Sequence, residues 1–260
     1  MIGNPSNWLR RSSLLLGAAC VAAALHANAA DRFDAAVANP GRSAADVKRD
    51  ALDHPADILR LSGIVPGMRI ADVLAGDGYY SELASYVVGP KGKVFMINNA
   101  AFDHWSEGPL QARLQSGRLG NVEHETLDLD HMNLAPASLD AVFLIKVYHD
   151  LYWVDSEGGV WPKIDTRGVL DQLARALKPG GVLLLVDHSA KAGSGNSAAS
   201  ALHRIEESYA ITDFESRGLK VVAKSDLLRR PEDARDQISY KGPMLGKTDR
   251  FVLVFRKTGP

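Results

Sequence analysis

Three histidines follow the ends of predicted strands, and histidine is the side chain best suited to transfer a proton near neutral pH. His149 follows the apolar run 141–147, His188 follows the apolar run 182–186, and His203 is expected to begin a helix beyond a Gly/Ser-rich stretch. The carboxyl ends of parallel strands meet at one edge of a sheet, where ligands bind. We therefore expect His149, His188 and His203 to lie together as candidate catalytic residues.

Other roles for this cluster stay open. Each histidine can form a purely structural hydrogen bond at a strand end. Together with Asp150, the three histidines also have the donor atoms of a metal site. They are far apart in the sequence and lack the short spacing that is typical of metal ligands, so we expect no metal.

A second group of candidates lies in residues 69–84, RIADVLAGDGYYSELA, a stretch that predicts a strand, a turn and a helix. Gly76 and Gly78 permit a tight turn and the close approach of a ligand, although a plain strand-to-helix loop can have the same glycines. No Gly-Lys-Ser/Thr follows, which excludes a P-loop. Tyr80 and Ser81 stand where a dinucleotide fingerprint has its third glycine, which disfavours a nicotinamide oxidoreductase.

Strand and helix patterns alternate along the chain and predict the elements that position these residues. The expected strands are residues 69–74, 93–97, 122–127, 141–147, 182–186, 219–223 and 251–255. Expected helices include one capped by Ser43, one running from Pro55 to Gly63, and one that carries Leu202, Ile205 and Tyr209. This alternation predicts an α/β domain with a mostly parallel sheet.

Residues 1–29 have the three parts of a cleavable signal peptide. Two arginines precede an uncharged apolar run, residues 14–25, and small residues follow at Ala27 and Ala29. The run has 12 residues, whereas a membrane span needs about 20. We expect cleavage after Ala29, a periplasmic or secreted mature chain, and no stable membrane span in that chain.

Two variants of this export signal fit less well. Gly17 stands where the lipoprotein box before Cys20 usually has leucine, so lipid anchoring is the weaker alternative. Arg10 and Arg11 loosely resemble a twin-arginine signal, but the usual phenylalanine of that signal is missing.

The chain of 260 residues has 30 Lys and Arg against 31 Asp and Glu, a net charge of −1. This balance gives no basis for nucleic acid as the main partner. Without residues 1–29 the balance is 28 against 31 and the only cysteine, Cys20, is lost, which excludes disulfides and a Cys-rich zinc site. We expect a lead-in with a helix at 30–50, a single domain at 51–260 and a small-molecule partner; the oligomeric state is not predicted.

From about residue 42 to residue 256 the chain resembles the class I S-adenosylmethionine-dependent methyltransferases. Residues 72–78, DVLAGDG, look like their first motif, and residues 177–181, LKPGG, look like the turn into their fifth strand. A bacterial group of exported predicted methyltransferases is more similar still, through Gly78-Tyr79-Tyr80, Asp187-His188, His203-Arg204-Ile205 and Lys247-Thr248-Asp249-Arg250-Phe251. The resemblance implies a Rossmann-like class I methyltransferase fold, with a seven-stranded, mostly parallel sheet, helices on both faces and an antiparallel last strand.

The resemblance also implies S-adenosylmethionine as cofactor and assigns roles to matching positions. Asp72 would face the methionine amine, and Gly76 and Gly78 would let the backbone meet the methionine portion of the cofactor. Leu74 replaces the first glycine of the motif, which is a departure from the family pattern.

Two further positions concern the nucleoside half of the cofactor. Asn98 stands where an acidic residue commonly holds both ribose hydroxyls, and it can still accept one hydrogen bond. Asp128 or Asp130, with Asp130 favoured, would accept a hydrogen bond from the adenine amino group. Either aspartate can equally be a solvated loop carboxylate.

Two segments are candidates for the walls of the site. The loop 151–165 contains Tyr152, Trp153 and Trp161 and suits an apolar or aromatic acceptor, although it can equally pack its aromatic rings against the body. The charged stretch 42–54 forms either a lid over the cofactor or a solvated helix face.

The leading hypothesis is an S-adenosylmethionine-dependent methyltransferase that acts on a small molecule. The alternative is an exported, non-catalytic binding protein that retains the fold. Leu74 and Asn98 favour the alternative, whereas Gly76 and Gly78 favour the enzyme.

Overall fold

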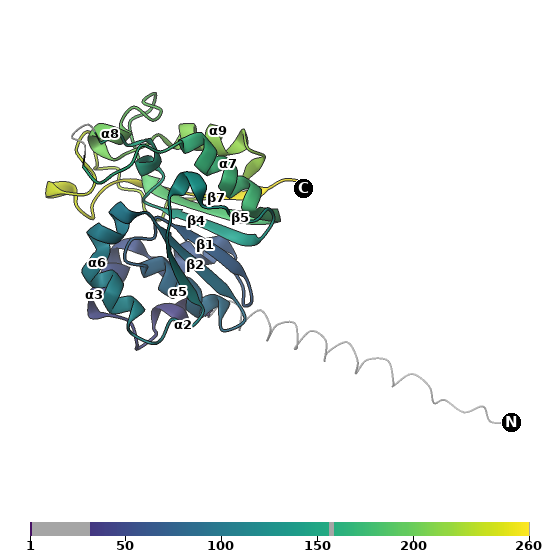
Figure 1. Cartoon of the computed structure of the whole chain (residues 1–260). Coiled ribbons are helices and arrows are strands. Elements are labelled where there is room, and N and C mark those ends of the chain that lie inside the picture. Colours follow the sequence, from purple (N-terminus) through teal and green to yellow (C-terminus); the bar gives the residue numbers. More distant parts are fainter. Residues whose placement is uncertain (2–31, 156–158, 260) are drawn as a thin grey trace.

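The structure is a computed structural model that describes Met1, residues 32–155 and residues 159–259 (Figure 1). Apart from Met1, the predicted signal peptide and its cleavage site lie outside the described residues, as does Cys20. In the described part of the chain, no helix is long and apolar enough to cross a membrane.

Seven strands form one sheet in the order β3-β2-β1-β4-β5-β7-β6. They are β1 (Arg69–Val73), β2 (Lys93–Asn98), β3 (Val122–Thr126), β4 (Leu139–Ile145), β5 (Leu177–His188), β6 (Leu219–Ser225) and β7 (Arg250–Lys257). Only β7 is antiparallel to its neighbours, β5 and β6. The predicted sheet is therefore confirmed. Its strand order reverses between β1 and β4, which is where open α/β sheets bind ligands.

Helices cover both faces of the sheet. On one face α2 (Arg32–Val37), α4 (Pro55–Ser62) and α5 (Tyr79–Val88) share a hydrophobic core with Ile70 of β1. On the other face α6 (Ala100–Leu114), α7 (Thr166–Ala176) and α9 (Glu207–Glu215) pack with Ala71, the next residue of the same strand. Successive strand residues point to opposite faces, so the central strands are buried on both sides.

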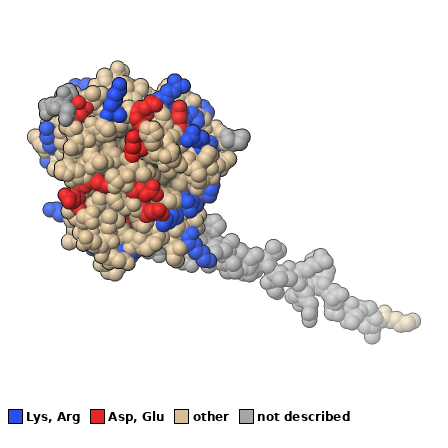
Figure 2. Space-filling model, viewed as in Figure 1, with Lys and Arg blue, Asp and Glu red and all other residues tan. Residues whose placement is uncertain are grey.

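The shorter elements lie around this framework. They are α3 (Ala44–Asp53), α8 (Ala199–Leu202) and the 3₁₀ helices η1 (Leu129–His131), η2 (His149–Tyr152) and η3 (Gly242–Met244). In the view of Figure 2, acidic side chains lie across the middle of the face and basic side chains lie mostly toward its edges. That face therefore presents no continuous basic surface.

The predicted starts and ends of the first helices are confirmed. Ser43 caps α3, because its Oγ accepts a hydrogen bond from the backbone N–H of Asp46 at 3.1 Å. Pro55 begins α4, and Gly63 ends it with a φ of 66°, a left-handed conformation that glycine adopts without strain.

The prediction of one helix carrying Leu202, Ile205 and Tyr209 is wrong. α8 ends at Leu202, and His203 has a φ of 50°, which breaks the helix. Ile205 then pairs with Ser189 in a short bridge before α9 begins. His203 therefore follows a helix and does not begin one.

α3 presents buried charged side chains to the body of the protein. Asp46 and Asp53 are each 4% exposed, so the expectation of a solvated face is wrong at these two positions. Asp46 accepts hydrogen bonds from Arg113 of α6 at 2.9 and 3.0 Å, and Asp50 accepts hydrogen bonds from Arg42 at 2.7 Å. These ion pairs hold α3 against the body.

Asp53, the last residue of α3, joins cations from three distant parts of the chain. Its carboxylate accepts hydrogen bonds from Arg49 at 2.7 Å and from Lys146 at 2.9 Å, and it also bonds Arg250. Lys146 follows β4 and Arg250 begins the antiparallel β7, so both lie at the carboxyl edge of the parallel strands. Burial raises the pKa of Asp53, but the three cations outweigh it and hold this pKa well below its usual value.

We predict that Asp53→Asn lowers the free energy of unfolding by about 3 kcal/mol near neutral pH, because it leaves buried cations without their carboxylate. The contribution of Asp53 should be complete above the usual carboxyl pKa and should be lost as the pH falls through its depressed folded-state pKa. Urea unfolding measures both effects. Asp57→Asn, which removes an exposed partner of Arg60, is the control and should change stability by less than about 1 kcal/mol.

Candidate active site

A cavity of about 510 Å³ opens at the carboxyl ends of β4 and β5. All three predicted catalytic histidines line it, together with Phe102, Trp105, Lys146, Asp150, Trp153, Ser239 and Tyr240. The ring of His149 lies 5.7 Å from that of His188 and 5.4 Å from that of His203, measured between centroids. The structure thus brings the three histidines together as expected, and their catalytic roles stay predictions.

His149 lies between two carboxylates. Its Nδ1 is 2.6 Å from Oδ1 of Asp187 and its Nε2 is 3.2 Å from Oδ1 of Asp150. Its backbone N–H also donates to Asp187 at 2.8 Å. Burial lowers the pKa of His149, but the charges of Asp150 and Asp187 outweigh it and raise the pKa to about 10. Because both ring nitrogens are occupied, His149 is not a free base in this arrangement.

His203 completes a chain of alternating carboxylates and imidazoles. Its Nδ1 is 3.1 Å from Oδ1 of Asp150. Its ring packs edge-on against Tyr240, with centroids 4.6 Å apart, and lies 5.2 Å from Trp153. The left-handed backbone of His203 is strained for a non-glycine residue, and the packing of its ring holds it there.

His188 and Lys146 lie beside this chain. Nδ1 of His188 is 2.7 Å from the hydroxyl of Thr248. Burial, together with His149 and Lys146, lowers the pKa of His188 well below its usual value, so its imidazole is neutral at neutral pH. Burial and the neighbouring Arg49 lower the pKa of Lys146 to about 8.

The loop after β1 keeps the expected turn although Leu74 replaces its first glycine. Leu74 has a φ of 54° and is buried in the core. This left-handed conformation costs a leucine about 1–2 kcal/mol. Gly76 and Gly78 follow with φ values of 60° and 83°.

Asn98, which was expected to meet the ribose, is fully buried and bonded within the protein. Its Oδ1 accepts a hydrogen bond from the N–H of Gly76 at 3.0 Å, and its Nδ2 donates to the carbonyl of Gly76 at 2.9 Å and to Asp103 at 2.8 Å. Both ends of the amide are therefore in use. In the structure Asn98 fixes the glycine loop to β2, and its contact with a ribose stays a prediction.

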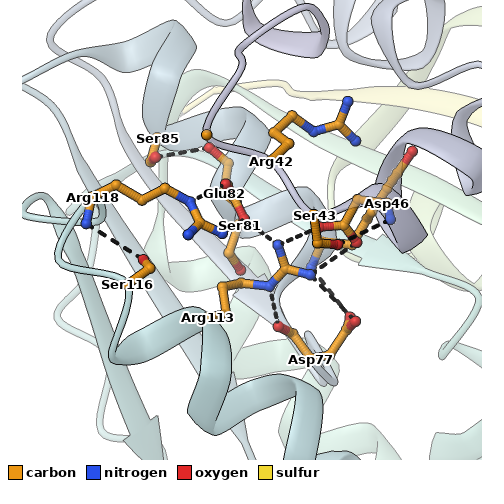
Figure 3. A network of polar contacts seen from close by, with 12 residues as sticks. Arg42, Ser43, Asp46, Asp77, Ser81, Glu82, Ser85, Arg113, Ser116 and Arg118 are labelled. Carbon is orange, nitrogen blue, oxygen red and sulfur yellow. Dashed lines mark hydrogen bonds and ion pairs between the residues drawn. The ribbon is translucent and has the colours of Figure 1, made fainter.

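The other side of the loop is fixed by Arg113 (Figure 3). Arg113 donates to the carbonyl of Asp77 at 2.5 Å and also bonds Asp46 of α3 and Glu82 of α5. A Cβ at Gly78 would lie 2.5 Å from Sδ of Met96. The space beside Gly78 is thus filled by the protein, and this glycine is needed for packing.

Three features of the end of β1, its following loop and the neighbouring end of β2 fit the predicted cofactor. Asp72 is 3% exposed, and Ser81, at 2.7 Å, is the only described side chain that hydrogen bonds to it, so its carboxylate can hold an ammonium group. A Cβ at Gly76 would meet nothing closer than Ser106 at 3.5 Å, which leaves room beside the backbone. Nδ2 of Asn99 is buried without a hydrogen-bond partner among the described residues and can donate to a ligand oxygen.

Both candidate adenine contacts, Asp130 and Asp128, form hydrogen bonds within the protein. Asp130 lines a second cavity of about 640 Å³, and its carboxylate accepts a hydrogen bond from the backbone of Asp165 at 2.9 Å. Asp128 caps η1 and bonds His131 at 3.0 Å. An adenine contact of either aspartate stays a prediction.

The aromatic residues of the loop 151–165 line two different cavities and also pack against the body of the protein. Trp153 lines the histidine cavity. Trp161 is buried and stacks on Trp105 of α6 with centroids 5.8 Å apart. Tyr152 lines the second cavity instead. The loop therefore lines the cavity with Trp153 and packs Trp161 against the body, and its contact with an acceptor stays a prediction.

Several residues at this site had no assigned role in the sequence. They are Phe102, Trp105, Lys146, Asp187, Ser239 and Tyr240. Only Asp187 had a recognisable signal, because it is a charged residue at the end of an otherwise apolar buried strand. The others reach the cavity through long-range packing.

Residues 72–185 match a family model described as a methyltransferase domain. A ubiquinone/menaquinone biosynthesis C-methyltransferase from Ectopseudomonas mendocina is 24% identical over 205 residues, which cover 77% of this chain and 72% of that protein.

Solved structures with a similar fold include an S-adenosylmethionine-dependent methyltransferase from Aquifex aeolicus and the [4+2]-cyclase SpnF. The first has a TM-score of 0.57 at 22% identity and covers 80% of this chain and 92% of its own. The second has a TM-score of 0.56 at 15% identity and covers 86% of each chain.

The chain therefore has the Rossmann-like class I methyltransferase fold. Its matching domain and this fold together support a methyltransferase and indicate S-adenosylmethionine as the cofactor. The similarity to an exported bacterial group stays a prediction.

We predict that binding of S-adenosylmethionine weakens as the pH falls below about 7. Burial raises the pKa of Asp72 to about 7, so acid neutralises the carboxylate that is expected to face the cofactor's ammonium group. Affinity should fall by up to about tenfold per pH unit. Calorimetry near pH 7.5 and near pH 5.5 measures it, about half a unit above and well below that pKa.

Asp72→Asn should bind the cofactor weakly at both pH values. Asp57→Asn on α4 is the control and should keep the pH dependence of the unaltered protein. Equal affinity at both pH values in the unaltered protein would show that Asp72 does not hold the ammonium group.

Proposed function

We propose that this methyltransferase transfers a methyl group to a small aromatic acceptor that binds in the 510 Å³ cavity. The observation that carries the proposal is the position of this cavity. β1 pairs directly with β4, with Asp72 beside Phe143, so the loop that fits the cofactor and the strand end that carries His149 are neighbours. Bound S-adenosylmethionine supplies an electrophilic methyl group, and the protein must align a nucleophile with it.

The walls of the cavity support an aromatic acceptor. Trp105 and Tyr240 line it although they are 52% and 50% exposed, and the rings of Trp153 and Tyr240 both pack against His203. Large apolar rings exposed around a pocket mark binding surfaces. The name of the relative from Ectopseudomonas mendocina describes a C-methyltransferase of ubiquinone and menaquinone biosynthesis, and a flat ring of that kind can stack on tryptophan and tyrosine.

Within the cavity, His188 is the histidine best placed to accept a proton from the acceptor. Carboxylate oxygens contact both ring nitrogens of His149 and Nδ1 of His203. Among the described residues, the hydrogen-bond partner of the His188 ring is the hydroxyl of Thr248, at Nδ1. Nε2 of His188 is thus left for the acceptor, while His149 and His203 orient the polar end of the cavity.

We predict that His188→Ala lowers kcat at least about 100-fold and leaves the Kd for S-adenosylmethionine nearly unchanged, because general bases contribute about 10²–10⁴-fold to rate. Methyl transfer to a panel of phenols and quinols, together with cofactor calorimetry, measures both quantities. His104→Ala, at an exposed position of α6, is the control with normal turnover. A His188→Ala protein with unchanged kcat would remove His188 from the reaction.

Cofactor binding also decides between the enzyme and a non-catalytic binding protein. We expect heat and a rise in Tm when S-adenosylmethionine is added to residues 30–260. If millimolar cofactor produces no heat and no rise in Tm, the result contradicts the methyltransferase and favours the binding protein.

We also propose that residues 1–29 are a signal peptide and that the mature chain works in the periplasm or outside the cell. The support is the arrangement of the basic, apolar and small residues that precede Ala30. Terminal sequencing of the protein recovered from its host should find Ala30 first. Retention of Met1 would contradict export by cleavage.

A further inference from the structure

Three donor atoms converge at the polar end of the cavity. Nε2 of His149 lies 3.2 Å from Oδ1 of Asp150, and the same oxygen lies 3.1 Å from Nδ1 of His203. All three donors lie within 4.8 Å of one another. η2 and the end of α8 bring them together, which their separation in the sequence did not reveal.

These separations suit a common metal ion. Nitrogen and oxygen ligands lie about 2.0–2.2 Å from zinc, so two ligands at tetrahedral or octahedral angles lie about 3.0–3.5 Å apart. The two measured separations, 3.2 and 3.1 Å, fall in this interval. The two imidazole nitrogens lie within 4.8 Å of each other, so an ion between the three donors requires the rings to adjust.

A second, independent feature is the carboxylate behind His149. Asp187 is fully buried, and its Oδ1 lies 2.6 Å from Nδ1 of His149, the nitrogen on the far side of the ring from Asp150. Histidines that bind metals usually have such a carboxylate on their other nitrogen, because it fixes the ring and strengthens the ligand. His203 is fixed in turn by its contacts with Tyr240 and Trp153.

We propose that His149, Asp150 and His203 bind one divalent transition-metal ion. Two imidazoles and one carboxylate favour ions such as Zn²⁺, Fe²⁺ or Co²⁺ over Mg²⁺ or Ca²⁺. The charges of Asp150 and Asp187 favour a cation here. Lys146 and Arg250 oppose it, but both are bonded to Asp53.

The ion would also define the acceptor, a step that rests on the proposed function. Three protein ligands leave at least one coordination position, and His149, Asp150 and His203 all line the cavity. An acceptor with a ring hydroxyl can bind there through its oxygen. A metal-bound hydroxyl is more acidic, and His188, which lines the same cavity, can accept its proton.

The test uses the mature chain, residues 30–260, after treatment with a chelator. Titration with Co²⁺ should produce the visible absorption of a site with nitrogen ligands, and calorimetry with Zn²⁺ should give one ion per chain with a micromolar or lower Kd. His203→Ala and Asp150→Asn should each raise this Kd at least about 100-fold. Asp187→Asn should raise it about 10–100-fold, because it removes only the support of His149.

His131→Ala is the matched control. His131 also has its Nδ1 3.0 Å from a carboxylate, that of Asp128, but the pair is exposed and has no second histidine. This variant should bind the ion like the unaltered protein.

The absence of binding, or a Kd that His203→Ala leaves unchanged, would overturn the proposal. Circular dichroism in chelator shows whether each variant folds. If Asp150→Asn does not fold, the Kd of His203→Ala for the ion decides. Calorimetry of the metal-free protein with S-adenosylmethionine separates the two proposals. Cofactor binding without ion binding removes only the metal site, whereas the loss of cofactor binding removes the methyltransferase function.

Discussion

The carboxyl edge of this sheet depends on the buried carboxylate of Asp53. It contacts Arg49, Lys146 and Arg250 together, and these residues come from α3, the end of β4 and the start of β7. Hydrophobic burial holds the two helical layers on the sheet but does not by itself fix a helix across its edge. The ion pairs of Asp53 do so, and they also hold Lys146 at the wall of the cavity.

A second set of buried carboxylates lies next to the first, and the two sets influence each other. Asp187 and Asp150 hold the histidines, while Lys146 and Arg250, bonded to Asp53, help to keep His188 neutral. The backbone is strained at the same edge, because Leu74, Lys146 and His203 have positive φ values. Such strain persists only where surrounding contacts fix the geometry, and here ion pairs and aromatic packing provide those contacts.

The elements of the fold and the meeting of the histidines could be predicted because both follow from local patterns. Apolar periodicity defines the strands, and parallel strands place residues such as His149 and His188 at one edge. Contacts over long sequence separations could not be predicted in this way. The pairing of Asp53 with Arg250, the break at His203 and the bonding of Asp187 to His149 each depend on a partner that the local sequence does not identify.

The two departures from the expected cofactor motif are compensated in the structure. Leu74 keeps the left-handed turn at a small cost in energy. A carboxylate at position 98 could accept the N–H of Gly76 but could not donate to its carbonyl, whereas the amide of Asn98 does both. With both ends of the Asn98 amide in use, its contact with a ribose stays a prediction, and Nδ2 of Asn99, which has no hydrogen-bond partner among the described residues, is a neighbouring donor. The loop keeps its conformation with both departures, so neither of them argues against an enzyme. Because the same fold also occurs in a [4+2]-cyclase, the polar groups of the cavity, and not the loop, determine which reaction this chain performs.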